Sequence, residues 1–125
     1  MGQLADNKQK QLVNKLIPLL HKLNFANIWV KKHPEYPNPP SSKYIVDDYN
    51  PNLVAEKDGT DYYFEFINEY DLNETISNTA LQKMVEASNS KWDVTIVIAI
   101  EYGRTEEINK LYSHFNISPS QVWEL

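Results

Sequence analysis

PNLVAEKDGTDYYFEFIN, residues 51–68, holds two short runs of apolar and aromatic residues with a turn signal between them. The runs 53–57 and 62–67 are typical of strands, because β-branched and aromatic residues pack well on a pleated sheet. Between them lies Asp-Gly-Thr-Asp, which favours a two-residue turn with Gly59 and Thr60 as its loop. The stretch therefore predicts an antiparallel hairpin.

Side chains alternate between the two faces of this predicted hairpin, and the turn sets which residues pair. A loop at Gly59 and Thr60 pairs Leu53 with Phe66 on one face. This face is expected to be core and carries Leu53, Ala55, Lys57, Tyr62, Phe64 and Phe66. The other face carries Asn52, Val54, Glu56, Tyr63, Glu65 and Ile67. The polar side chains of Asn52 and Glu65 stand on a strand pair otherwise suited to burial, so they mark the first candidate site.

Four residues of the hairpin resemble a known signature. Pro51 and Asn52 at the head of the first strand, with Glu65 and Ile67 on the second, resemble the pattern of the PD-(D/E)xK, or restriction-endonuclease-like, superfamily. That pattern is Pro-Asp on one strand and Glu-x-Lys on the next. The resemblance implies a layered α/β fold in which the acidic residues hold a divalent metal and the lysine activates water or stabilises the phosphate charge.

The chain departs from this pattern at two of the three chemical positions. Asn52 replaces the aspartate and can offer Mg²⁺ an oxygen but no charge, and Ile67 replaces the lysine and cannot stabilise an anion. We therefore expect a catalytically inactive nuclease-fold protein that acts as a binding or regulatory module without a metal cofactor. Its partner is expected to be a protein, bound through the proline-rich loop 33–42, which is expected to be extended and exposed, or through an acidic face.

An active metal-dependent nuclease with a rearranged site is the alternative. Its Mg²⁺ or Mn²⁺ would be held by oxygens from Asp48, Asn52, Glu56 and Glu65. Lys83, on the helix after the hairpin, would replace the missing lysine, so Glu65 and Lys83 would be the catalytic residues. A third hypothesis is a small regulator unrelated to nucleases, because fold does not fix function. It would be favoured if a helix covered the hairpin face that carries Asn52 and Glu65.

Hydrophobic periodicity predicts the remaining elements, in the order α-β-β-β-α-β-α-β. A first helix is expected from the cap Asp6 to about residue 24, and Pro18 should kink or divide it. Further helices are expected over 73–88 and from the cap Thr105. Besides the hairpin, strands are expected from Ile28 to near Lys32, at 94–100 and at 122–125, and 44–46 is strand-like. Parallel strands linked by helices make a layered, restriction-endonuclease-like α/β sheet, here in a single domain over 1–125.

Charge is distributed unevenly along the chain. Residues 1–33 carry six lysines against one acidic residue, whereas residues 34–90 carry three lysines against eleven acidic residues. An acidic centre repels a phosphate backbone, so nucleic acid is a disfavoured partner. The chain has no cysteine and no apolar run near the roughly 18 residues that span a bilayer, which predicts a cytoplasmic protein without a membrane segment. Eight Tyr and four Phe favour self-association as a homodimer.

Overall fold

The computed structural model describes residues 2–43, 50–68, 70, 79–89, 93–115 and 121–125. Its elements, in chain order, are α1 (Gly2–Lys22), β1 (Ala26–Val30), the short 3₁₀ helix η1 (Ser41–Lys43), β2 (Leu53–Lys57), β3 (Thr60–Ile67), α3 (Thr79–Asn89), β4 (Val94–Ile100), α4 (Thr105–Phe115) and β5 (Gln121–Glu124). Apart from η1, the predicted order of helices and strands is confirmed.

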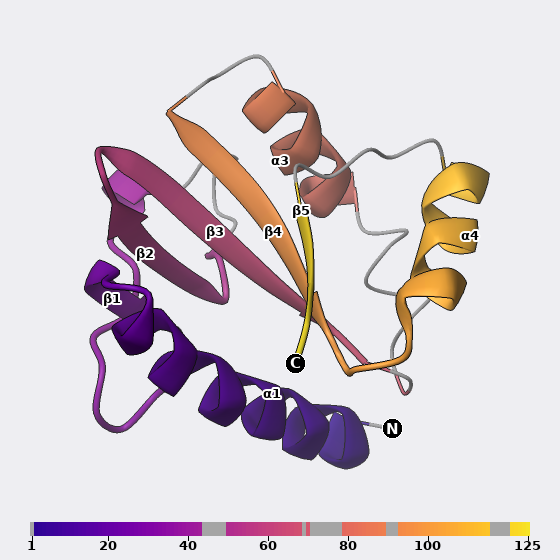
Figure 1. Ribbon diagram of the computed structural model, residues 1–125, viewed down its shortest axis with the longest axis horizontal. Coiled ribbons are helices and arrows are strands. Elements are labelled where there is room, and N and C mark those ends of the chain that lie inside the picture. Colours follow the sequence, from indigo (N-terminus) through magenta and orange to yellow (C-terminus); the bar gives the residue numbers. More distant parts are fainter. Residues whose placement is uncertain (1, 44–49, 69, 71–78, 90–92, 116–120) are drawn as a thin grey trace.

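The five strands form one mixed sheet in the order β1-β2-β3-β4-β5 (Figure 1). The pairs β1–β2 and β2–β3 are antiparallel, whereas the pairs β3–β4 and β4–β5 are parallel. A parallel pair needs a crossover connection, and α3 and α4 lie in the two crossovers. β4 is flanked by strands on both sides and buries every residue from Ile96 to Ile100, as its continuous β-branched sequence predicts.

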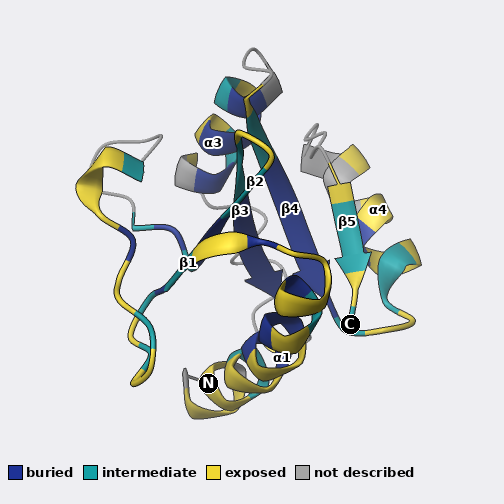
Figure 2. Cartoon of the chain, turned by 60° about the vertical axis from the view of Figure 1, so that its left-hand side comes forward, coloured by how far each residue is buried: buried dark blue, intermediate teal, exposed yellow. Residues whose placement is uncertain are grey.

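Helices cover both faces of the sheet, which makes three layers (Figures 1 and 2). α1 buries one apolar side against the face that carries Leu53, Phe64 and Phe66, and its other side is exposed. The core on that face contains Leu12, Val13, Leu16, Ile17 and Leu20 of α1. On the opposite face, β2, β3 and β4 pack against Leu81, Met84 and Val85 of α3 and Ile108 of α4. The assignment of hairpin residues to two faces is thus confirmed.

The predicted hairpin register is wrong by one step at the turn. Asp58 and Gly59 form the loop with φ angles of 53° and 80°, and Lys57 pairs with Thr60. Two consecutive positive φ angles are the requirement of a type I′ turn, for which Asp-Gly is a preferred sequence and Gly-Thr is not. Leu53 consequently pairs with Phe64 instead of Phe66. Each partner moves by two residues, so the side chains keep their faces.

The predicted first helix differs from the structure in its start and in the effect of Pro18. α1 begins at Gly2, before the predicted cap Asp6, because residues 3–5 favour helix and no breaker separates them from it. Pro18 lies on the exposed side and does not divide α1, which continues to Lys22. The predicted strand-like segment 44–46 lies outside the described residues, as does the expected start of the second helix.

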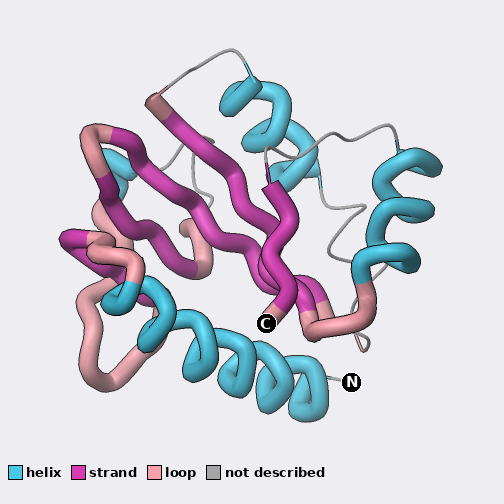
Figure 3. Tube along the Cα trace, viewed as in Figure 1, coloured by secondary structure: helices cyan, strands magenta, loops and turns pink. Residues whose placement is uncertain are grey.

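A segment between β1 and β2 folds back along the sheet edge (Figure 3). We call residues 31–43 the strap. Lys31 N donates to Asn52 O on the β2 side, so the neighbouring Val30 N points away from β2. Val30 N donates to Pro37 O at 2.9 Å. The outer edge of β1 is therefore covered at this point by the strap.

Tyr36 and Pro39 fix the middle of the strap. Pro39 is buried, and Tyr36 packs against the core beneath α1. The Tyr36 hydroxyl lies 3.0 Å from His21 Nε2 on α1. The proline-rich loop, which was expected to be extended and exposed, is thus docked on the domain over part of its length.

No helix in the described part of the chain combines the length and the apolar character needed to cross a membrane.

Candidate functional site

Asn52 and Glu65 lie opposite each other where β2 begins. The observed register continues from the Leu53–Phe64 pair to Asn52 and Glu65, so the corrected turn brings them closer than the predicted one did. Asn52 Nδ2 donates to Glu65 Oε2 at 2.5 Å, and Asn52 N lies 3.4 Å from Glu65 Oε1. Glu65 is 1% exposed. Both oxygens of a buried carboxylate are therefore occupied by N–H groups of one residue.

The amide of Asn52 is itself held in place by its neighbours. Gln9 Nε2, on α1, donates to the side-chain Oδ1 of Asn52 at 3.3 Å, and Lys31 N donates to the backbone O of Asn52 at 2.9 Å. The bond from Gln9 to Oδ1 and the bond from Nδ2 to Glu65 together fix the orientation of the side-chain amide. This polar network joins α1, β1, β2 and β3 at one corner of the sheet.

The other predicted site residues do not join this pair. Glu56 pairs with Asp61, four positions from Asn52 along β2, which is about 13 Å at strand spacing. Lys83 is exposed, whereas the α3 side chains three and four positions away from the sheet-facing Leu81 are buried, so Lys83 points away from the sheet. Asp48 lies outside the described residues. Of the predicted set, the described structure brings together Asn52 and Glu65.

The described residues at this corner fit a divalent cation poorly. Mg²⁺ prefers carboxylate oxygens, and Glu65 is the carboxylate here, with hydrogen-bond donors on both oxygens. A buried side-chain oxygen without a hydrogen-bond partner, Asn50 Oδ1, is available nearby in sequence but carries no charge. Among the described residues no group of three or more His, Asp or Glu side chains could hold a metal. Asn52 puts its N–H groups where a cation would have to lie.

A second polar cluster lies at the other end of the hairpin. Lys43, the last residue of the strap, places Nζ 2.8 Å from Glu56 Oε2 and 3.1 Å from Asp61 Oδ2. The ammonium also lies over the Trp29 ring, 5.2 Å from its centroid. Asn27 Nδ2 donates to Glu56 Oε1 at 2.6 Å. One lysine is therefore held between two carboxylates and an aromatic face.

The local backbone explains how Asn27 reaches this cluster. The pairing of β1 with β2 is irregular between Ala26 and Trp29, and Asn27 has a φ of 48°. A bulge of this kind turns a side chain out of the regular alternation, and asparagine tolerates the left-handed conformation well. The bulge thus aims Asn27 at Glu56.

The two charged partners shift each other's protonation. The hydrogen bond from Lys43, followed by that from Asn27, lowers the pKa of Glu56. Burial lowers the pKa of Lys43, but the hydrogen bonds to Glu56 and Asp61 and their charges outweigh it, so that pKa is raised. Tyr63, on the same face, has its pKa raised to about 12, chiefly by burial. At neutral pH the Lys43 ammonium and the Glu56 carboxylate are therefore both charged.

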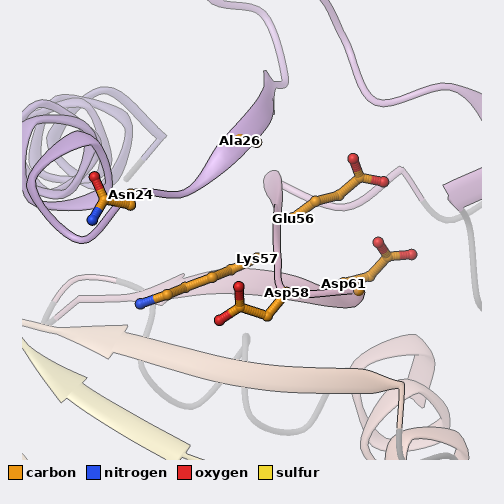
Figure 4. A pocket seen from close by; sticks show the side chains of 7 residues that line it. Asn24, Ala26, Glu56, Lys57, Asp58 and Asp61 are labelled. Atoms are coloured by element: carbon orange, nitrogen blue, oxygen red, sulfur yellow. The ribbon is translucent and has the colours of Figure 1, made fainter.

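A pocket of about 420 Å³ opens beside this cluster, between the hairpin turn and the segment that joins α1 to β1. Its lining residues are Asn24, Ala26, Glu56, Lys57, Asp58, Gly59 and Asp61. In Figure 4 the carboxylates of Glu56 and Asp61 point the same way, whereas Lys57 and Asp58 point in the opposite direction. Lys57 Nζ lies over the Phe25 ring, on the face of α1, as the predicted alternation requires. The pocket and the Lys43 cluster thus share the residues Glu56 and Asp61.

Sequence reasoning missed this second cluster. Lys43 is 13 residues from Glu56 and belongs to a segment without periodicity, so no spacing rule connects them. A correct turn assignment would have paired Glu56 with Asp61 and raised the question of what compensates two facing carboxylates. Lys57, the nearest lysine in sequence to Glu56, points to the other face.

No protein-family model, curated protein or solved structure matches this chain.

Proposed function

We propose that this chain is a binding module on a nuclease-like α/β scaffold and performs no metal-dependent phosphodiester cleavage. The observation that carries this proposal is the contact between Asn52 and Glu65, in which two N–H groups take both oxygens of the buried carboxylate. The chain has the glutamate of the superfamily pattern, but the carboxylate oxygens of Glu65 accept hydrogen bonds from Asn52 that join the start of β2 to β3. The same glutamate would have to be released before it could bind a cation.

The remaining positions of the pattern support the same function. Ile67 is 1% exposed and belongs to the core beneath α3, so it is a packing residue. Lys83 points to solvent from the far side of α3. Neither residue supplies a cation beside Glu65, and phosphoryl chemistry needs one to offset the developing negative charge.

The partner of the module is proposed to be a protein. The hairpin face that carries Asn52 and Glu65 also packs against Leu81, Met84 and Val85 of α3, so among the described residues that face is occupied by protein side chains and does not form an open nucleic-acid surface. The same covering favours the hypothesis of a regulator unrelated to nucleases, which shares with our proposal a binding function and the absence of cleavage. Other described surfaces, including the pocket at the hairpin turn, stay open to a partner.

Cleavage assays with matched variants test the absence of nuclease activity. Single- and double-stranded DNA and RNA would be incubated with the protein in Mg²⁺ or Mn²⁺, beside Glu65→Gln, which preserves shape, and Lys83→Met, which removes the exposed lysine. We expect no cleavage above the buffer control for any of the three proteins. Cleavage by the native protein that Glu65→Gln abolishes would contradict the proposal, and loss in Lys83→Met as well would favour the rearranged nuclease.

A further inference from the structure

We propose that Lys43 is a built-in occupant of an ammonium-binding site and that the strap is an autoinhibitory latch over that site. The site consists of Glu56, Asp61 and the ring of Trp29. Its external ligand is a lysine side chain carried by an extended segment of a partner protein. This role rests on the binding function proposed above.

The side chains around Lys43 provide three features of ammonium recognition. Glu56 and Asp61 accept its hydrogen bonds at 2.8 and 3.1 Å, and the Trp29 ring lies 5.2 Å away. Carboxylates paired with an aromatic face bind an ammonium group by charge and by the ring quadrupole. Asn27 holds Glu56 from the other side, which fixes its carboxylate before a ligand arrives. The chain's own lysine thus identifies the ligand class.

The latch has the means to open because, among the described residues, few hydrogen bonds tie the strap beyond Lys31 to the domain. Besides Lys43, these are Val30 N to Pro37 O and the contact of Tyr36 with His21, together with the packing of Tyr36 and Pro39, and Lys32 N to Asn38 Oδ1 closes the strap on itself. Exposed prolines in the strap cannot donate further hydrogen bonds to an edge strand. Release of Lys43 would leave Glu56 and Asp61 uncompensated while the outer edge of β1 became open. An extended segment could then add to β1 and place its lysine between the two carboxylates.

The two acidic residues of the site also belong to the lining of the adjoining pocket. Glu56 and Asp61 are among its lining residues, so their negative charge attracts an approaching ammonium before Lys43 is displaced. Electrostatic attraction of this kind raises the rate of encounter. The native protein should therefore bind an external lysine weakly, in competition with Lys43, and a protein without the Lys43 ammonium should bind it more strongly.

The test compares Lys43→Met with the native protein and with Lys110→Met, a control that removes an exposed lysine of α4. The probe is Nα-acetyl-lysine amide, and its uncharged control is Nα-acetyl-norleucine amide. Amide shifts of Glu56 and Asp61 and the indole N–H of Trp29 report binding. We expect Lys43→Met to bind the lysine probe about tenfold more tightly than the other two proteins, because a competing occupant has been removed. We expect it not to bind the norleucine control.

Hydrogen exchange at Val30 and Lys32 tests the latch itself. Val30 N donates to the strap and Lys32 N donates within it, so Lys43→Met should raise their exchange rates roughly three- to tenfold, whereas Lys110→Met should not. Asn38→Ala keeps Lys43 and loosens the strap, and it should also tighten probe binding; it serves equally if Lys43→Met fails to fold. Equal affinity of all folded proteins for the lysine probe, or shifts that also follow norleucine, would overturn the proposal.

Failure here and failure of the proposed function have different signatures. Cleavage that depends on Glu65 would contradict the proposed function and leave lysine binding intact, since Glu65 lies about 13 Å from Asp61 along β3 at strand spacing. If the protein neither cleaves nucleic acid nor binds lysine, that result would contradict the latch and leave the proposed function intact.

Discussion

Asn52 decides the chemistry of the first site through its nitrogen. An aspartate in its place would put a second carboxylate opposite Glu65, and two buried carboxylates in contact require a cation or a proton between them. Asparagine removes that requirement because its amide and backbone N–H groups donate directly to Glu65. Asparagine at this position thus makes a hydrogen-bonded pair with Glu65 where an aspartate would create a position suited to metal binding.

Asn52→Asp should reverse this conversion. In the absence of metal we expect a loss of about 2–4 kcal/mol in the free energy of unfolding, because a buried carboxylate loses its donor and gains a like charge. Added Mn²⁺ should restore stability in a saturable way, as expected for a ligand that binds the folded state. Urea unfolding at several Mn²⁺ concentrations measures both effects. Asn52→Ala is the control, and it should lose stability without a response to Mn²⁺; an equal response of both variants would contradict the reasoning.

The ion pair of Lys43 and Glu56 should stabilise the fold within a defined pH window. The hydrogen bond from Lys43 lowers the pKa of Glu56, so its contribution is complete above the usual value of 4.5 and is lost as the pH falls through the lowered one. The pKa of Lys43 is raised despite burial, so its contribution is complete below 10.5 and is lost as the pH rises through the raised one.

Lys43→Met makes this window measurable. At pH 7 the variant should be about 1 kcal/mol less stable than the native protein, as expected for a partly exposed pair. The difference should shrink as the pH falls from 4.5 towards 3 and as it rises beyond 10.5. Denaturant titrations of both proteins across the range give the difference directly. A difference that stays constant between pH 7 and pH 3 would show that Lys43 stabilises by packing instead of charge.

At the scale of elements, the strands show what sequence can predict. β4 was predicted with the correct bounds because a run of β-branched residues without a breaker has few alternatives. The presence of the hairpin and the assignment of its side chains to two faces were predicted correctly, because they depend on the period of two. Its register was not, because register depends on which two residues take positive φ. The strap could not be predicted, because its position results from scattered contacts between Lys43, Tyr36 and residues far away in sequence.

Gly59→Ala tests the observed turn. Gly59 has a φ of 80° and no atom within 4 Å of an added Cβ, so the cost is backbone strain without a clash. We expect a loss of about 1 kcal/mol. Asp58→Asn is the matched control and should be neutral or slightly stabilising, because Asn-Gly is the preferred type I′ sequence. Thermal unfolding of the two variants measures the difference. A neutral Gly59→Ala would argue against a positive φ at this position.

For the whole molecule, a single sheet carries two cores that share its strands. β2, β3 and β4 place alternate side chains in the core beneath α1 and in the core beneath α3. The same strands therefore support both cores, and loss of either helical layer would disturb the strands on which the other layer packs. This arrangement follows from the alternation of apolar residues and was predictable. What the sequence did not indicate is that Asn52 and Glu65 would form a hydrogen-bonded pair while Ile67 takes a core position and Lys83 an exposed helix face.

Leu16→Ala and Leu81→Ala test the coupling of the two cores. Both leucines are essentially unexposed, one beneath α1 and the other beneath α3. Each variant should lose about 2–5 kcal/mol by lost burial and cavity formation. Both should still unfold in one transition when circular dichroism and tryptophan fluorescence are compared. Separate transitions in either variant would show that the layers unfold independently.

The central claim is that Asn52 has replaced the cation at Glu65. A Mg²⁺ titration of the native protein, followed by the amide shifts of Asn52, Glu56 and Glu65 and with Asn52→Asp as the positive control, tests it most directly. We predict no localised, saturable shifts in the native protein at millimolar Mg²⁺, and such shifts at residues 52 and 65 in the variant. Saturable shifts at Asn52 and Glu65 in the native protein would contradict the claim and place a metal where we infer a hydrogen-bonded pair.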